Sequence, residues 1–240
     1  MAASPLGISS SSPAASAPWF AGLLVVALIA FWPTYLSRLA ATDAYTHLHA
    51  VSAALWMVLL VAQPLAIRTR RLDLHRAMGR ASWVLAPFVL AAIVLLAHSR
   101  LQGLDARRFL DQTYVLYLQV SLAALWSLCY GLAIAWRRTT ALHARFMVCT
   151  GLTLIDPVAI RLMFWIDSTP SWNYQWLTFG LTDLVLAALI AAERRSASGR
   201  GVFPAMLALF VLLQAPPLLG LTASAPWQSF SRWFAALPLT

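Results

Sequence analysis

Lysine is absent from this 240-residue chain, and all 17 basic residues are arginine. Charged residues of both signs make up only 10% of the sequence, against about a quarter in an ordinary soluble domain. Without a polar domain to carry it, nucleic-acid binding is excluded as a main function, although the net charge is +9. Hydrophobic residues reach 61%. This composition predicts an integral membrane protein whose arginines set topology and contact lipid phosphates.

Cysteine is also scarce, with only Cys129 and Cys149 and no Cys-x-x-Cys pair. Covalent haem attachment and zinc-finger sites are therefore not expected. Both cysteines fall inside predicted spans, and we interpret them as small buried apolar residues without a disulfide. Residues 1–18 contain no charge and hence no basic n-region of a secretory signal. Their Ser, Ala and Pro content predicts a disordered tail.

Seven apolar stretches follow. The six whose two ends can be placed each have about the length needed to cross a hydrocarbon core of about 30 Å. They lie roughly at residues 19–36, 47–67, 81–98, 113–136, 143–165 and 173–192, with the seventh starting near residue 202. We therefore predict an all-α transmembrane helical bundle over residues 19–222. Kinks are expected at Pro33 and, because of Pro157, near Thr153, while Pro216 and Pro217 interrupt the last stretch. Aromatic residues in 223–240 predict an amphipathic tail in the outer interface.

Arginine is distributed unevenly between the connections, which predicts the orientation. Ten arginines follow the second, fourth and sixth spans: Arg68, Arg70, Arg71, Arg76, Arg80, Arg137, Arg138, Arg194, Arg195 and Arg200. Five follow the first and third spans or lie in the tail: Arg38, Arg100, Arg107, Arg108 and Arg232. The positive-inside rule then places the N-terminus inside and the C-terminus outside a bacterial inner membrane.

A polar stripe runs along the second predicted span. His49, Trp56 and Gln63 recur every seven residues, which leaves them on one slowly drifting face of a helix. Because lipid would not solvate these groups, the stripe should face protein. His47 points about 160° away from His49 and is expected to meet the interface or a neighbouring loop.

The histidines fall at two levels. His49 and His98 lie near the predicted outer face, and His75 and His143 near the inner face. Imidazoles on facing helices can hold a haem, so one hypothesis is a b-type haem, or a related redox cofactor, at each level. His75, expected in a loop, would suit a propionate better than iron. The alternative is that these histidines form only hydrogen bonds at the span ends.

The segment from His75 to Arg80 reads His-Arg-Ala-Met-Gly-Arg. Gly79 permits close backbone approach, and His75, Arg76 and Arg80 supply donors for an anionic group such as a lipid phosphate, a haem propionate or a carboxylate. A positive-inside loop would explain the arginines, but not His75 or Gly79.

Charged residues also occur inside predicted spans. Asp156, Arg161 and Asp183 should lie within the membrane, and burying them singly is costly. We therefore expect Arg161 to pair with Asp183, Asp156 or both, in a polar pocket that also includes Gln63 and Gln119. The group is either a proton or ligand pocket that opens outward, or an ion pair that holds two spans together.

These motifs resemble a family of bacterial multi-pass membrane proteins that has no established activity. The resemblance covers the second to fifth spans, about half of the chain, and rests on H-R-x-x-G-R and H-x-R-x-M with the stripe before them: His49, Trp56, Gln63, His75, Arg76, Gly79, Arg80, His143, Arg145 and Met147. It implies a polytopic helical bundle. H-R-x-x-G-R is also similar to a motif of haem A synthase, in which a Glu stands three residues ahead of the His; here that residue is Leu72.

Three functional hypotheses follow. The first is a haem protein for electron transfer or respiratory cofactor handling, with respiratory-chain proteins as partners. The second is a transporter or membrane assembly factor without a cofactor, which uses Asp156, Arg161 and Asp183. The third is a structural membrane partner. The sequence favours the first, and it does not decide whether the protein is an enzyme.

Overall fold

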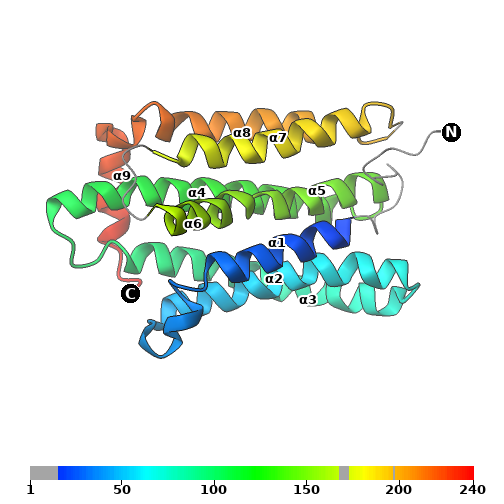
Figure 1. Ribbon diagram of the computed structural model, residues 1–240, viewed down its shortest axis with the longest axis horizontal. Coiled ribbons are helices and arrows are strands. Elements are labelled where there is room, and N and C mark those ends of the chain that lie inside the picture. The colour runs from blue at the N-terminus through cyan, green and yellow to red at the C-terminus, as the bar shows by residue number, and fades with distance from the viewer. Residues whose placement is uncertain (1–15, 168–172, 197) are drawn as a thin grey trace.

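The structure is a computed structural model and describes residues 16–167, 173–196 and 198–240. These residues form helices and no strand (Figure 1), so the predicted all-helical fold is confirmed. The helices are α1 Ala17–Ala30, η2 Leu36–Ala41, α2 Ala44–Arg68, α3 Leu72–Ser99, α4 Ala106–Ala135, α5 Thr140–Leu152, α6 Ile155–Ile166, α7 Gln175–Glu193, α8 Val202–Leu218, η3 Leu221–Ala223 and α9 Ala225–Ala235.

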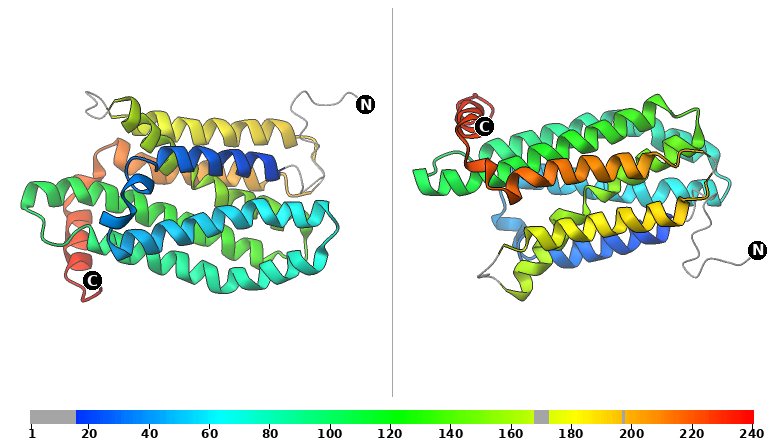
Figure 2. Two further views of the ribbon diagram at one scale, coloured as in Figure 1. Left: turned by 60° about the horizontal axis from the view of Figure 1, so that its bottom comes forward. Right: turned by 90° about the horizontal axis from the view of Figure 1, so that it is seen from above.

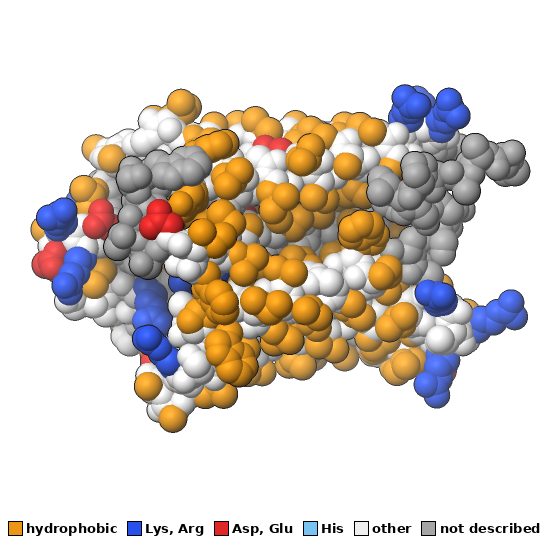
Figure 3. Space-filling view, in the orientation of Figure 1, with side chains coloured by type: hydrophobic (Ala, Val, Ile, Leu, Met, Phe, Trp, Pro, Cys, Tyr) orange, Lys and Arg blue, Asp and Glu red, His pale blue; other side chains and the backbone are white. Residues whose placement is uncertain are grey.

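Five segments of the described chain are long and apolar enough to cross a membrane: α2, α3, α4, α5 with α6, and α7. Helices α1 and α8 are apolar but shorter, at 14 and 17 residues. Apolar side chains cover the visible flank of the bundle, and charged side chains gather at its two ends (Figure 3). The chain is therefore a multi-pass membrane protein.

The interrupted helix α5–α6 is central to the bundle. Helix α5 packs against α2, α4 and α8, and α6 packs against α1 and α7. In Figure 1, α1 to α3 lie on one side of this helix, and α7 and α8 on the other. The turns α2–α3, α4–α5 and α7–α8 lie together at one end, which we call the arginine-rich end. The opposite end is the α9 end.

The kink expected near Thr153 is present. Pro157 has no N–H to donate to the carbonyl of Thr153, and α5 ends at Leu152 before α6 begins at Ile155. Pro157 then lies in the first turn of α6, where a missing N–H costs little. Counted from Thr140 to Ile166, the break falls near the middle of the combined segment.

Other boundaries differ from the sequence prediction. Helix α3 begins at Leu72, about nine residues earlier than expected, so the segment from His75 to Arg80 is helical and not a loop. The chain reverses between α2 and α3 within three residues, with Arg70 at φ 58°. At the N-terminus, α1 ends at Ala30, before Pro33.

Helix α8 continues through Pro216 and Pro217 to Leu218 and is not interrupted there.

Helix α9 lies across one end of the bundle (Figure 2). Trp227 Nε1 donates to the carbonyl of Thr113 at 2.9 Å, and Gln228 Nε2 donates to Thr113 Oγ1 at 2.7 Å. Phe234 is buried against α3 and α4, whereas Trp233 is 58% exposed. The helix is amphipathic, as predicted, and its place in the outer interface stays a prediction.

Candidate functional site

The carboxyl group of Asp156 is buried in the first turn of α6, with 4% of the residue exposed. Thr178 Oγ1 donates to its Oδ1 at 2.5 Å, and Gln175 Nε2 donates to the same atom at 2.6 Å. Both donors are neutral side chains of α7, and no arginine of the described chain pairs with Asp156. A carboxyl held only by neutral donors can take up a proton without breaking an ion pair.

A small cavity of about 20 Å³ lies beside Asp156. Its polar lining comes from Asp156, Ser121, Thr182 and Gln214, and the rest is apolar. This volume suffices for about one water molecule, and the lining offers the two to four polar partners that such a water needs. Gln214 Nε2 also donates to Oδ1 of Asp183 at 3.1 Å. Gln214 therefore links the cavity beside Asp156 to the carboxyl group of Asp183.

A larger hollow of about 440 Å³ opens at the α9 end, lined by Asp111, Tyr114 and Asn173 among others. Asn173 Nδ2 donates to the Tyr114 hydroxyl at 3.4 Å. The backbone N–H of Gln175 donates to Asn173 Oδ1 at 2.9 Å. Asn173 therefore connects the hollow to Gln175, which in turn binds Asp156. The result is a path of polar groups from the α9 end to the middle of the bundle.

The break between α5 and α6 contributes to this site. It exposes the N-terminus of α6 beside Asp156, and the helix dipole there favours a negative charge within the first turn. Broken helices near the membrane midplane are a recurrent way to build binding sites in transporters. The local backbone and the side-chain donors together hold the Asp156 carboxyl at the centre of the bundle.

The expected ion pair of Arg161 is wrong. Its guanidinium carbon lies 5.8 Å from the centroid of the Phe31 ring, and neither Asp156 nor Asp183 pairs with it in the described chain. Arg161 follows Asp156 by five residues, which places the two about 140° apart around α6. Asp156 faces α7 while Arg161 faces α1. Similar depth in the membrane does not bring two side chains together when they lie on different faces of a helix.

The predicted polar pocket is also divided. Gln63 lies near the arginine-rich end, and Gln119 Oε1 is buried without a hydrogen-bond partner in the described chain. Gln175, Thr178 and Gln214, which bind the two carboxyl groups, are not among the residues predicted from the sequence. Gln175, Thr178 and Thr182 stand three and four residues apart on one face of α7, and this polar stripe could have been found.

A second polar group occupies the arginine-rich end. The Gln63 amide, oriented to suit its neighbours, donates to His75 Nδ1 and accepts the N–H of Gly79 at 3.0 Å. His143 Nδ1 lies 2.8 Å from the carbonyl of Ala133, so Nδ1 carries the proton and Nε2 has the lone pair. His75 and His143 are close enough to interact electrostatically. The structure thus brings together three of the predicted residues.

The aromatic residue of the stripe faces protein, as predicted. Trp56 is 1% exposed, and its Nε1 donates to Thr150 Oγ1 at 3.3 Å. Its ring meets the edges of Trp126 and Tyr130, whose hydroxyl lies 2.9 Å from Ser82 Oγ.

The histidines of the α9 end have different surroundings. His98 is 1% exposed, with Nδ1 2.7 Å from Thr240 Oγ1 and the Gln102 amide 3.2 Å from Nε2. A haem iron at His98 would have to replace one of these partners. His49 Nδ1 is buried without a hydrogen-bond partner among the described residues. A haem between His49 and His98 stays a prediction.

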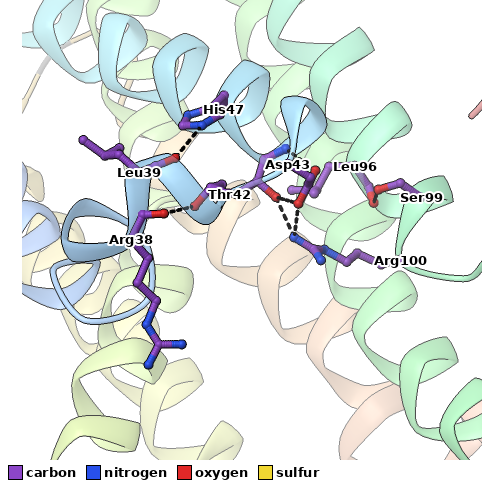
Figure 4. Close-up of polar contacts among 9 residues, drawn as sticks. Arg38, Leu39, Thr42, Asp43, His47, Leu96, Ser99 and Arg100 are labelled. Carbon is purple, nitrogen blue, oxygen red and sulfur yellow. Dashed lines mark hydrogen bonds and ion pairs between the residues drawn. The ribbon is translucent and has the colours of Figure 1, made fainter.

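His47 lies at the surface of the same end, near a cap and an ion pair (Figure 4). Its Nε2 is 3.1 Å from the carbonyl of Leu39, so its neighbour is the short helix η2 and not a loop. Asp43 caps α2 by accepting the N–H of Thr46 at 2.9 Å, and it pairs with Arg100 at 3.0 Å. Partial burial alone would raise the pKa of Asp43. The hydrogen bonds from Thr46 and the charge of Arg100 outweigh burial and hold this pKa below its ordinary value.

No family model matches the chain, and no curated protein or solved structure matches it either. Among the described residues, no group of three or more His, Cys, Asp and Glu side chains could hold a metal ion.

Proposed function

We propose that this chain is a bacterial inner-membrane transport protein without a cofactor, in which Asp156 takes up and releases a proton that enters from the α9 end. The observation that carries the proposal is a buried carboxyl held by Gln175 and Thr178 beside a water-sized cavity. Ionisable residues inside a membrane are expensive and commonly mark ion and proton pathways. A neutral, protonated Asp156 and an ionised one are both accommodated by these donors.

In this proposal α1 and α8 complete a bundle of seven spans. Helix α8 is 17 residues long, or about 25 Å at 1.5 Å per residue, and packs against α4, α5 and α7. Helix α1 packs against α2 and α6. The arginine-rich end faces the cytoplasm, and the hollow at the α9 end therefore opens outward.

The proton path follows the polar groups already described. Asp111 and Tyr114 in the hollow attract a proton or a hydrated cation, and Asn173 and Gln175 lead to Asp156. The adjoining cavity, lined by Asp156 and Gln214, has room for one water that would bridge the two side chains, and Gln214 in turn binds Asp183, the second carboxyl of the path. Conformational change between the two halves of the broken helix would then expose the carboxyl to the other side.

Infrared difference spectroscopy tests the proton-carrying role without any knowledge of a transported substrate. The wild-type protein in lipid should show the carbonyl stretch of a protonated carboxylic acid that appears and disappears with pH. Asp156→Asn, which keeps the shape and the hydrogen bonds, should remove that band. The matched control Asp73→Asn changes an exposed carboxyl at the arginine-rich end and should keep it.

Liposome measurements complete the test. Wild-type protein in liposomes with a trapped pH-sensitive dye should pass protons under an imposed potential, and Asp156→Asn should reduce this flux at least tenfold. An acid band that Asp156→Asn leaves unchanged, or an Asp156→Asn variant that conducts like the wild type, would refute the proposal.

A second candidate function, haem binding for electron transfer, is favoured by one observation at the arginine-rich end. His143 offers Nε2 while its Nδ1 proton is held by a backbone carbonyl, which is the usual arrangement of a ligating histidine. His75 lies nearby on α3, and Arg76 and Arg80 on the same helix could bind propionates. Expression with ample haem should give a Soret band that His143→Ala removes. Without such a band in the wild type, this candidate fails.

A further inference from the structure

The two cysteines of the chain meet inside the bundle. Cys129 on α4 and Cys149 on α5 are 0% exposed, and Met206 on α8 beside them is 1% exposed. The Cys129 thiol donates to the Met206 thioether, with Sγ and Sδ 3.8 Å apart, and Cys149 is buried in the same core cluster as both residues. Both cysteines are reduced. Three sulfur-containing side chains from three helices, here called the sulfur cluster, therefore lie together in one buried cluster.

The distance between two of these sulfur atoms fits one edge of a known coordination geometry. A metal–sulfur bond of about 2.3 Å places the three sulfurs of a trigonal site about 4.0 Å apart, because each edge of the triangle is √3 times the bond length. The observed 3.8 Å between Cys129 Sγ and Met206 Sδ is close to that edge. Thiolate and thioether sulfur are soft ligands that favour Cu(I).

We propose that the sulfur cluster of Cys129, Cys149 and Met206 is a binding site for a monovalent copper ion. Each thiol that becomes a ligand releases its proton, so binding of Cu(I) yields one or two protons and changes no oxidation state. The proposal is independent of the role of Asp156, because the sulfur cluster shares no residue with that path.

The surroundings favour Cu(I) over zinc. Structural zinc prefers four ligands in a tetrahedron, and the packing around the cluster is apolar, with Leu125, Leu152, Leu186, Phe203 and Phe210 in the same core. The carboxylate of Glu193 is already bound by Arg145. A low-dielectric site with three sulfurs suits a singly charged ion, because one thiolate neutralises its charge.

A competition titration tests the proposal. Purified full-length protein in detergent, kept anaerobic with ascorbate, is titrated with Cu(I) against the chelator bicinchoninate. We expect one Cu(I) per wild-type chain. Cys129→Ala and Cys149→Ala should each abolish the binding, and Met206→Leu, which conserves volume, should weaken it roughly tenfold or more. X-ray absorption should show only sulfur neighbours at about 2.3 Å.

Met57→Leu is the matched control, because Met57 is buried in a different apolar cluster with α1 and α6. It should bind Cu(I) like the wild type. Wild-type protein that takes up no Cu(I), or Cys129→Ala and Cys149→Ala variants that still bind one Cu(I) per chain, would overturn the proposal. If a cysteine variant does not fold, the titration of the wild-type protein alone still shows whether the chain binds Cu(I).

Discussion

Arg145 on α5 forms the most enclosed ion pair of the described chain, with 8% of its side chain exposed and 15% of that of Glu193. Its Nε donates to Glu193 Oε2 at 2.5 Å, its Nη1 to the carbonyl of Ala141 at 2.8 Å, and its Nη2 to Ser196 Oγ at 2.9 Å. The guanidinium thus ties α5 to the end of α7 and to the turn after it. Arg145→Leu should destabilise the protein strongly.

The magnitude follows from these contacts. Removal of one partner of a buried ion pair costs about 3–5 kcal/mol, and the lower value applies here because Glu193 is the last residue of α7 and can reach water. At roughly 2–4 °C per kcal/mol for a protein of this size, the melting temperature should fall by roughly 6–12 °C. Arg145→Leu combined with Glu193→Leu should recover most of this loss, because no charge is then left unpaired.

Tryptophan fluorescence during thermal unfolding in one detergent gives all four corners of this double-mutant cycle. We expect a coupling free energy of about 2 kcal/mol or more between Arg145 and Glu193. Arg137→Leu is the control, since Arg137 is exposed at the same end, and it should change stability by less than about 0.5 kcal/mol. If the two single losses simply add, the pair contributes nothing specific and the reasoning fails.

Three further predictions concern packing, topology and pH. A Cβ at Gly151 would collide with the Phe20 ring, so Gly151→Ala should cost about 1–3 kcal/mol, whereas Gly131→Ala has open space and should be neutral or stabilising; equal effects on the melting temperature would contradict this. A reporter fused after Arg195 should read cytoplasmic and one at the C-terminus periplasmic, and the same side for both would refute the topology. Asp43→Ala should cost about 1 kcal/mol through the lost cap. Because the folded state lowers the pKa of Asp43, this contribution is present above the ordinary pKa of 3.8 and should disappear as acid protonates the carboxyl. Unfolding of the wild type and of Asp43→Ala, measured from neutral to acid pH, should show the difference in stability vanish in acid.

The broken helix shows how far sequence reasoning reached. Pro157 must remove a backbone hydrogen bond wherever the chain folds, so the kink near Thr153 was predictable from one residue. The start of α3 was not, because the arginines between Arg68 and Arg80 suggested one loop, although only Arg70 and Arg71 lie in the turn and α3 already contains Arg76 and Arg80. A helix can extend beyond the apolar core, and hydropathy reports only the part in lipid.

The partners of the charged residues at the candidate site could not be predicted from the sequence. Depth along a helix follows from counting residues, and it places Asp156 and Asp183 at similar levels, with Arg161 shallower but within reach through its long side chain. The partners of each depend on the angle around the helix axis and on which helices become neighbours. Arg161 therefore turned out to face α1, while α7 supplied the donors to Asp156.

The sequence by itself determined that this protein is a helical membrane protein, because the burial of so many apolar side chains with so few charges is stable only in lipid. It also determined where Pro157 interrupts a helix, because that effect is local to the backbone. Only the tertiary structure decided that Gln175 and Thr178 hold Asp156, that Gln63 meets His75, and that Cys129, Cys149 and Met206 converge. Such contacts join residues that are distant in the chain, and the packing of whole helices, which no local pattern encodes, decides which side chains meet.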